Sequence, residues 1–186
     1  MDDIQKQLES AEQAMAKAYK HTQVEFAKFN VGRANPNMLD RVVVGYYGNA
    51  TPLNQMASVS TPDARTFVIK PWEKGHIAAI EKAILRSGLD LTPQNDGELI
   101  RISVPALTEE RRKSLVKQVK NAAEKGRVGV RNIRKEVKEA LKHLQKEGTA
   151  EDVIKKAEER LQELTDKYIH EIDQLLAHKE AEMMEV

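Results

Sequence analysis

Apolar positions between Thr108 and Glu147 recur every seven residues on two neighbouring seams. This spacing predicts one uninterrupted helix, about 60 Å long at 1.5 Å per residue, with Thr108 as its N-cap. The two seams are Val116, Ala123, Val130, Val137 and Leu144, and Val119, Gly126, Ile133 and Ala140. Because only one face of this helix is apolar, we expect it to pack against partner helices.

Two further segments repeat this pattern and predict a first and a last helix. The first runs from Ile4 almost to Gly32, with a seam weakened at Thr22 and Glu25, and its core positions are Ile4, Leu8, Ala11, Met15, Ala18, Thr22 and Phe29. The last begins after Gly148, where Thr149 and Asp152 have the spacing of a capping box, and its core positions are Ile154, Ala157, Leu161, Leu164, Tyr168, Ile172, Leu175 and Met183. Three such stripes can bury one another in a bundle.

Residues 33–105 differ in character. They contain β-branched and aromatic runs, separated by Gly, Pro, Asn and Asp, at 41–44 with 46–47, 57–60, 66–69 and 99–104. A helical spacing from Ile77 to Leu85 stops at Gly88. The predicted class is α+β: a long three-helix bundle (1–30 and 106–186) with a small β/α/β domain (31–105) inserted between helices one and two.

Two segments join these domains, Asn30-Val31-Gly32 on the way out and Val104-Pro105-Ala106 on the way back. Gly32 and Pro105 do not easily extend a helix. A double connection restricts separation but permits rotation, so we expect a hinge and a bent arrangement of the domains.

Charge is distributed unevenly along the chain. The formal net charge of the 186 residues is +1, yet residues 106–147 carry 13 basic and 6 acidic side chains, whereas residues 148–186 carry 5 and 11. The near neutrality is therefore two opposed segments, +7 and −6, and the cationic character is local.

A row of charged residues flanks the seam of the central helix, and we call it the cationic stripe. Its members are Lys113, Lys117, Lys120, Glu124, Arg127, Arg131, Arg134 and Lys138. A rigid rod with one cationic flank suits an extended polyanion such as RNA or DNA. The arginines matter most, because a guanidinium can bind phosphate with two donors and stack on a base.

Two other interpretations of the stripe stay open at this point. Charged rows beside an apolar seam are ordinary solvated flanks in coiled coils. The acidic last helix could also neutralise the stripe across the bundle, through Glu158, Glu159, Glu163 and Asp166. At the start of the central helix, cations are unfavourable near the positive end of the helix dipole, which indicates a role beyond folding for which we favour Arg112.

Catalytic and metal chemistry find little support. The chain has no Cys, which excludes disulfides and thiolate sites and fits a reducing compartment. Its five His lack metal-ligand spacing, and it has no phosphate-binding glycine loop, dinucleotide fingerprint or nucleophile elbow. We predict no metal, no cofactor and no enzymatic activity. The acidic N-terminus and the lack of a long apolar run predict a cytoplasmic protein without a membrane segment.

Aromatic residues of the insert allow two uses. Gly45-Tyr46-Tyr47-Gly48 is typical of a strand and a turn. Tyr46, Tyr47, Phe67 and Trp72 could form a stacking platform, but core packing and turn anchoring are the commoner uses of such residues.

Several ordered strings of the chain carry a resemblance. They are Gly32-Arg33-Ala34 with Pro36 and Leu39-Asp40; Tyr46-Tyr47-Gly48 with Thr51-Pro52-Leu53, Gln55 and Ala57-Ser58-Val59; Glu81-Lys82-Ala83-Ile84; Leu107 to Lys113; and Val130-Arg131-Asn132-Ile133-Arg134. Over essentially its whole length the chain resembles bacterial ribosome recycling factor. The resemblance implies a monomer that acts after termination with elongation factor G and GTP to split the ribosome and release messenger RNA and deacylated transfer RNA.

The resemblance also implies where the protein touches the large ribosomal subunit. Ribosomal RNA contacts are expected at Arg112, Arg131 and Arg134, with Arg33 at the linker, and the stripe adds Arg127. Lys113, Lys117, Lys120 and Lys138 are expected to steer the approach. Many family members have Arg-Thr where this chain has Asn30-Val31, so no RNA contact is placed on Asn30, and the change bears on how freely the hinge turns.

Two alternative functions belong to other classes of protein. A coiled-coil adaptor would use the same seam to bind protein helices and would be insensitive to salt. A hydrolase or transferase centred on the insert would need a polar catalytic residue there, and the sequence nominates none.

Overall fold

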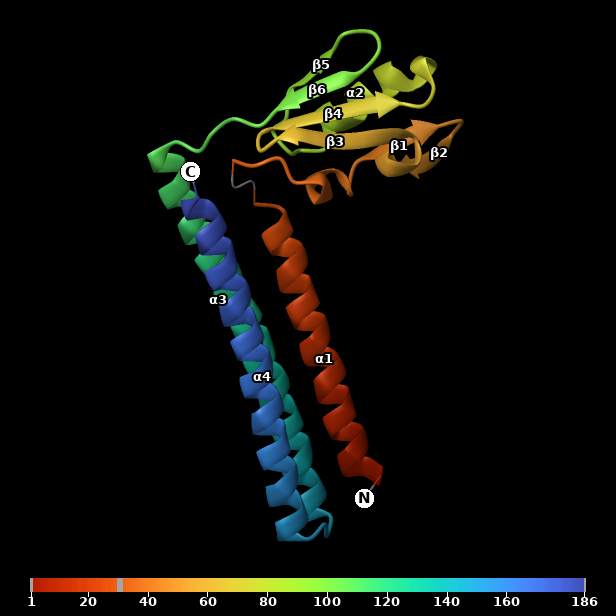
Figure 1. The fold of residues 1–186 in the computed structure, drawn as a ribbon. Coiled ribbons are helices and arrows are strands. Elements are labelled where there is room, and N and C mark those ends of the chain that lie inside the picture. The colour runs from red at the N-terminus through yellow and green to blue at the C-terminus, as the bar shows by residue number, and fades with distance from the viewer. Residues whose placement is uncertain (1, 30–31, 186) are drawn as a thin grey trace. The chain divides into compact units, whose positions relative to one another are not determined.

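A computed structural model describes residues 2–29 and 32–185 of the chain. The chain divides into two compact units, one made of Met1–Phe26 and Lys113–Val186 and the other of Ala27–Arg112. Long helices form the first unit, and two small sheets with one helix form the second (Figure 1). The α+β class predicted from the sequence is confirmed.

Three helices build the bundle: α1 (Asp2–Ala27), α3 (Glu109–Lys146) and α4 (Glu151–Met184). Within this unit α3 and α4 run antiparallel side by side, and α1 lies along them (Figure 1). The predicted central helix is thus α3, which follows the insert directly.

Both ends of α3 have clear capping interactions. At its start the Thr108 Oγ1 accepts a hydrogen bond from the Arg111 N–H at 3.2 Å, which confirms Thr108 as the N-cap. At its end Gly148 has a φ of +111°, and the N–H groups of Gly148 and Thr149 donate to the carbonyls of Gln145 and Leu144, both at 3.1 Å. These bonds form a Schellman motif.

The capping box predicted at Thr149 and Asp152 is therefore wrong. The backbone of Thr149 closes α3, and the N-cap of α4 is Ala150, whose side chain offers no acceptor. Because α4 begins at Glu151, its N-cap falls one residue later than the capping box requires, and Thr149 precedes that N-cap.

The buried face of α3 departs from the predicted seams in several places. Leu115 and Leu141 are buried, whereas the predicted Val116, Ile133, Ala140 and Leu144 are half-buried. A straight helix has 3.6 residues per turn, so a strict seven-residue repeat drifts around its surface, and α3 must face two neighbours rather than one. The buried set is Leu115, Val119, Ala123, Gly126, Val130, Val137 and Leu141.

Helix α4 follows its predicted seam closely, although the unpredicted Thr165 is buried and the predicted Leu175 is half-buried. In α1 the predicted Ala11, Met15 and Thr22 are buried, whereas the predicted Ile4, Leu8 and Ala18 are half-buried. In α1 the buried aromatic residue is Phe26 rather than Phe29, because the helix ends at Ala27. The buried sets are Ala11, Met15, Thr22 and Phe26 in α1, and Ile154, Ala157, Leu161, Leu164, Thr165, Tyr168, Ile172 and Met183 in α4.

The three helices approach closely at Gly126. A Cβ added there would collide with the Thr22 Oγ1 of α1 and would lie 3.2 Å from the Ile172 Cδ1 of α4. The expectation that Thr22 weakens the seam is therefore wrong: its hydroxyl is satisfied by the Ala18 carbonyl at 2.9 Å, and its side chain packs into the space that the glycine leaves.

The inserted unit contains two separate sheets (Figure 1). A hairpin pairs β1 (Val43–Tyr46) with β2 (Asn49–Pro52), and an antiparallel sheet has the order β3-β4-β6-β5. The remaining elements are β3 (Ala57–Asp63), β4 (Thr66–Pro71), α2 (Ile77–Arg86), β5 (Pro93–Asn95), β6 (Ile100–Ser103) and 3-10 turns at Pro36–Leu39, Leu53–Gln55 and Lys74–His76. Phe67 pairs with Ile102 at the centre of the larger sheet.

The core of this unit consists of large side chains. Phe67, Ile80 and Ile100 are among its fully buried members, and Ala57 is its one small member among the described residues. Phe67 thus serves core packing rather than stacking, and Tyr47 and Gly48, with φ values of +46° and +79°, make the hairpin turn. Strands β2 and β5 had no counterpart in the sequence prediction.

Both connecting segments of the insert are hydrogen-bonded to the turn between β3 and β4. The Ala34 N–H donates to the Ala64 carbonyl and the Val104 N–H to the Arg65 carbonyl, both at 2.7 Å. Gly32, with a φ of +78°, lies so close to Leu107 that a Cβ would be 3.2 Å from the Leu107 Cγ. Asn30 and Val31 lie outside the described residues, and the hinge itself stays a prediction.

Candidate nucleic-acid interface

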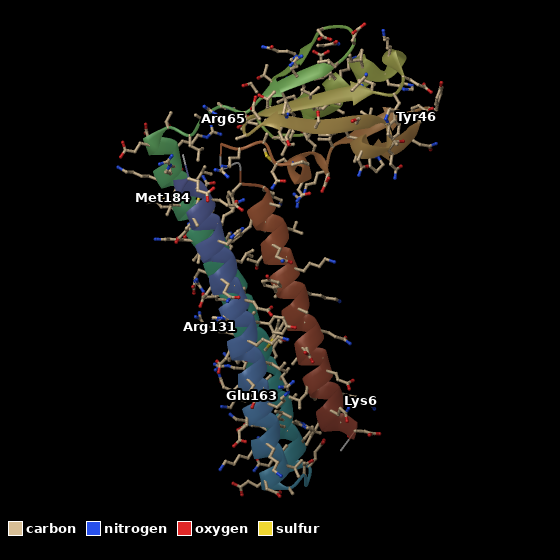
Figure 2. The ribbon with its side chains drawn as sticks, in the orientation of Figure 1. Lys6, Tyr46, Arg65, Arg131, Glu163 and Met184 are labelled. Atoms are coloured by element: carbon tan, nitrogen blue, oxygen red, sulfur yellow. The ribbon has the colours of Figure 1, made fainter. Side chains whose placement is uncertain are left out.

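All members of the cationic stripe lie on α3, and Figure 2 shows Arg131 on the bundle. The side chains of Arg127 and Arg134 are half-buried and the other members are exposed. The stripe therefore contains two kinds of arginine environment, which the sequence does not distinguish.

Arg127 is fixed by two carboxylates. Its Nε donates to the Asp173 Oδ1 of α4 at 2.7 Å, and its Nη1 donates to the Glu124 Oε2 at 2.8 Å. Burial alone would lower the pKa of Arg127, but the hydrogen bonds to Asp173 and Glu124 outweigh it and raise the pKa. With 18% of its side chain exposed, Arg127 contributes to the joint between α3 and α4.

Arg131 shares the carboxylate of Glu124. Its Nη1 donates to the Glu124 Oε1 at 3.1 Å, so one carboxylate lies between two guanidinium groups. Hydrogen bonds from Arg127 and then Arg131 lower the pKa of Glu124. About half of the Arg131 side chain, 47%, is exposed, and Glu124 is its one partner among the described residues. Its Nε–Nη2 edge retains the two parallel donors that a phosphate can accept.

Arg134 is held differently, through an amide. Its Nη1 donates to the Gln162 Oε1 at 3.2 Å, and the Gln162 Nε2 donates in turn to the Asp166 Oδ1 at 2.8 Å. The Arg134 Nε is buried and has no partner among the described residues. The stem of this side chain thus packs against the bundle, while no carboxylate of the described chain neutralises its head directly.

The remaining predicted contacts lie in the other unit. Arg112 is half-buried with a buried, unpartnered Nε among the described residues, much like Arg134. Its neighbour Arg111 forms a long ion pair of 3.8 Å with Asp90 instead. Arg33 is exposed and directly follows Gly32.

Three of the stripe lysines are less constrained than its arginines. Within the part of the chain that the structure describes, Lys117, Lys120 and Lys138 are exposed and form no ion pair. Such side chains are free to move and suit long-range attraction better than fixed contact.

Neutralisation of the stripe by α4 occurs through a residue that sequence reasoning missed. Glu163 pairs with Arg160 of its own helix at 3.0 Å, and Asp166 accepts from Gln162. Among the described residues, the α4 acid that contacts a stripe arginine directly is Asp173, 46 residues after Arg127. No local pattern gives this pairing, although Asp173 lies one heptad after Asp166 and so on the same side of α4.

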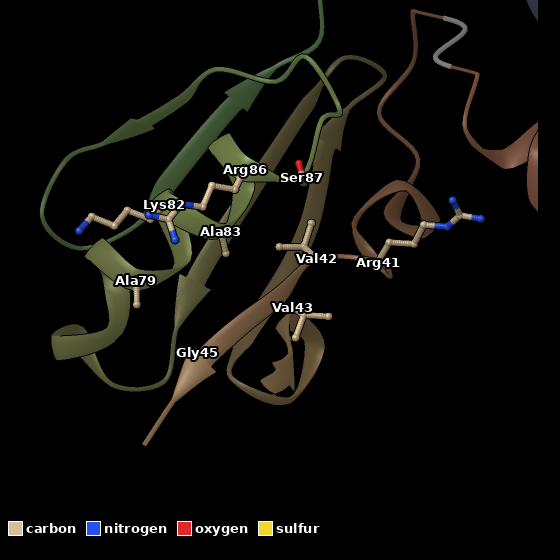
Figure 3. Close-up of a pocket in the computed structure, with 9 residues that line it drawn as sticks. All are labelled: Arg41, Val42, Val43, Gly45, Ala79, Lys82, Ala83, Arg86 and Ser87. Atoms are coloured by element: carbon tan, nitrogen blue, oxygen red, sulfur yellow. The ribbon is translucent and has the colours of Figure 1, made fainter. Parts of the chain in front are cut away.

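Two other surface features belong to the inserted unit. A groove of about 410 Å³ between β1 and α2 is rimmed by Arg41, Lys82 and Arg86, but Arg41 points away from the other two (Figure 3). Near the hairpin turn the rings of Tyr46 and His76 meet edge to face at 4.8 Å, and Trp72 is 67% exposed.

No group of three His, Asp or Glu side chains among residues 2–29 and 32–185 is placed to hold a metal ion. The same described residues include no helix that is long and apolar enough to cross a membrane.

A long helical bundle with an arginine-bearing flank and a separate sheet unit defines a class of binding factor. Comparison with known proteins gives the family. The family model described as ribosome recycling factor matches residues 22–184, and the chain belongs to this family of translation factors, which are not enzymes.

Relatives of the same family cover the chain almost completely. The ribosome-recycling factor of Amoebophilus asiaticus is 64% identical over 100% of both chains. That of Halalkalibacterium halodurans is 53% identical over 96% of this chain and 97% of its own.

Two solved structures are similar as well. A solution structure of a ribosome recycling factor matches all of both chains with a TM-score of 0.88 at 41% identity. The T. thermophilus factor, described together with E. coli elongation factor G on the E. coli post-termination complex, has a TM-score of 0.68 at 43% identity and covers 98% of this chain and 99% of its own.

Proposed function

We propose that this protein is the cytoplasmic factor that recycles ribosomes after termination, acting as a monomer with elongation factor G and GTP. The family and the relative described on a post-termination complex support this function. The bundle anchors to ribosomal RNA of the large subunit. The inserted unit, pushed by the GTPase, turns about the double connection and strains the contacts between subunits. GTP hydrolysis by the partner supplies the energy.

The observation that carries the RNA contact is the state of Arg131 and Arg134. Both are held in place at one nitrogen while other donors of their guanidinium groups remain for a ligand. A phosphate can accept two such donors at once, which favours arginine over lysine. We assign the principal contacts to Arg131, Arg134 and Arg112, and supporting ones to Arg33 and Arg127.

The hinge proposal rests on the connecting segments of the insert. Gly32 has a backbone conformation that other residues rarely adopt, and the two segments are tied to the neighbouring carbonyls of Ala64 and Arg65. We propose that Asn30, Val31, Gly32, Val104, Pro105 and Ala106 form the hinge, between domains at 1–30 with 106–186 and at 31–105. These bounds differ by a few residues from those of the compact units, of which the second extends from Ala27 to Arg112.

Subunit separation tests the function directly. The purified protein is added to post-termination ribosomes with elongation factor G and GTP, and light scattering follows the splitting. We expect acceleration over the GTPase alone, and none would reject the proposal.

The Arg131→Ala and Arg134→Ala variants test the contact. Each should weaken binding to large subunits by about 10-fold or more, the range for losing a charge-assisted hydrogen bond, and should lower the salt dependence of affinity. Unchanged helicity by circular dichroism serves as the folding control. If both variants bind large subunits as tightly as the unchanged protein does, the stripe is not part of the interface.

A further inference from the structure

Two series of polar contacts connect acids of α4 to arginines of α3. The first, which we call the Asp173 relay, runs from Asp173 through Arg127 and Glu124 to Arg131 in steps of 2.7, 2.8 and 3.1 Å. The second, the Asp166 relay, runs from Asp166 through Gln162 to Arg134 in steps of 2.8 and 3.2 Å. Each relay ends on an arginine of the proposed RNA contact.

Glu124 looks at first like a defect of the stripe. It is the one acid in a row of cations, and a carboxylate repels phosphate. On charge alone its removal would increase the positive potential of α3 and strengthen binding to RNA. The contacts indicate the opposite role.

We propose that Glu124 and Asp173 are positioning residues that hold Arg131 in the orientation in which it meets a phosphate of ribosomal RNA. This inference rests on the proposed function. Asp173 fixes Arg127, Arg127 fixes one oxygen of Glu124, and the other oxygen holds the Arg131 Nη1. The edge formed by Nε and Nη2 is left for the ligand.

The charges of the relay support a geometric effect. Two acids and two arginines sum to zero, so the relay as a whole adds no net charge to the bundle. Its gain lies in entropy: an arginine side chain that is ordered before binding loses less freedom on binding than a mobile one. Because Arg127 already neutralises much of Glu124, this carboxylate repels an approaching phosphate less than a lone one would.

The packing of the bundle fixes the relay. Arg127 follows Gly126, where α1, α3 and α4 approach closely, and Asp173 follows the buried Ile172 that borders this point. The backbone positions of both relay partners are thus set by the core rather than by the ion pair. Among the relay members Arg127 is the most enclosed, which suits a structural link better than a primary contact.

The decisive experiment compares Glu124→Ala with Glu163→Ala in equilibrium binding to purified large ribosomal subunits. Both variants remove one acid from an ion pair with arginine, but Glu163 lies outside the relays. We expect Glu124→Ala to weaken binding by about 2- to 10-fold, the range for ordering one long side chain. Glu163→Ala should leave the affinity equal or slightly higher. Equal or tighter binding by Glu124→Ala would overturn the proposal.

A double-mutant cycle identifies the residue through which Glu124 acts. In an Arg131→Ala background Glu124→Ala should have no further effect, whereas in an Arg112→Ala background its full effect should remain. A loss that persists without Arg131 would contradict the inference. If Arg131→Ala itself binds normally, the proposed RNA contact fails instead, so the two failures are distinguishable.

Asp173→Asn provides a second variant that leaves the α3 surface unchanged. It should reproduce part of the loss of Glu124→Ala. In the free protein, NMR relaxation of the Arg131 Nε–Hε group should show increased motion in both variants, with the unfolding midpoint of the bundle near that of the unchanged chain. An Arg131 side chain that stays equally ordered in both would refute the positioning role without any ribosome present.

Discussion

The bundle and the inserted unit differ in how many small residues their cores contain. The insert concentrates large side chains, with Phe67, Ile69, Ile100 and Ile102 fully buried, and its small buried residues among those described are Ala57 and Gly32. The described part of the bundle spreads its core along three helices and includes six small buried residues, namely Ala11, Thr22, Ala123, Gly126, Ala157 and Thr165. Substitutions that remove side-chain volume should therefore destabilise the insert more than the bundle. Substitutions that add volume should destabilise the bundle more than the insert.

Removal of a large side chain from the insert is the largest expected effect. Phe67→Ala should lower the free energy of unfolding of the insert by about 3–5 kcal/mol, because a fully buried ring at the centre of the sheet leaves a cavity. Amide hydrogen exchange measures both units at once. Protection should fall in β4 and β6 and persist in α3 and α4, and equal loss in the bundle would show that the units do not unfold separately.

Addition of one methyl group at Gly126 is the converse test. A Cβ would collide with Thr22 and crowd Ile172, so Gly126→Ala should overpack the bundle. Gly129→Ala is the matched control, since its Cβ would lie 3.9 Å from the Ala18 Cβ in ordinary contact. Alanine favours a helix by about 1 kcal/mol over glycine at both sites.

We therefore expect Gly126→Ala to be less stable than Gly129→Ala by about 1–3 kcal/mol in urea unfolding followed by circular dichroism of the helices. If both substitutions stabilise the protein alike, the close approach of the three helices is not a constraint. The proposed positioning of Arg131 would then lose its rigid support as well.

The same contrast explains which elements could be predicted from sequence. Seams such as those of α4 repeat locally, so Ile154, Leu161 and Ile172 could be assigned to the core without knowing their partners. Strand β2 contains Asn49 and Pro52, has little intrinsic strand preference, and forms because β1 pairs with it. Strand β5 likewise depends on β6. Non-local pairing has no short-range signal.

The candidate site likewise has features that follow from local periodicity and features that depend on non-local contacts. Periodicity along α3 was sufficient to place Arg131 and Arg134 on one flank. It could not separate Arg127 from them, because the difference is Asp173, and that contact requires the register of α3 against α4. The sequence also presented Glu124 as an interruption, whereas the structure shows a carboxylate shared by two arginines.

A smaller effect on stability is expected at the β1–β2 turn, where the cost of backbone conformation can be measured apart from that of side-chain volume. Gly48 has a φ of +79°, and a Cβ there would meet nothing within 4 Å. Gly48→Ala should cost about 1–2 kcal/mol through the left-handed backbone alone. Gly48→Asn should cost less, because asparagine adopts this conformation more readily. Equal stability of the two variants in urea would show that the turn changes its backbone instead.

The smallest expected effect concerns the lowered pKa values of two acids, one in each unit, which have different hydrogen-bond donors. Arginine side chains lower the pKa of Glu124, first through the Arg127 hydrogen bond and then through Arg131, whereas the backbone N–H groups of Leu99 and Glu98 lower the pKa of Asp96 in the insert. A carboxyl whose pKa is depressed by folding stabilises the protein above its unfolded pKa. That contribution is lost as the pH falls through the folded pKa.

Salt should distinguish these two acids in a carboxyl-carbon NMR titration. In about 1 M NaCl, where charges are screened within a few Å, the pKa of Glu124 should rise toward its ordinary value, because Glu124 and Arg131 are exposed. The pKa of Asp96 should stay low, because a turn presents its N–H donors at fixed positions. In Arg127→Ala the pKa of Glu124 should rise even at low salt. An unchanged value would mean that Arg131 alone holds this carboxylate, and Asp173 would then have no path to Arg131, the proposed RNA contact.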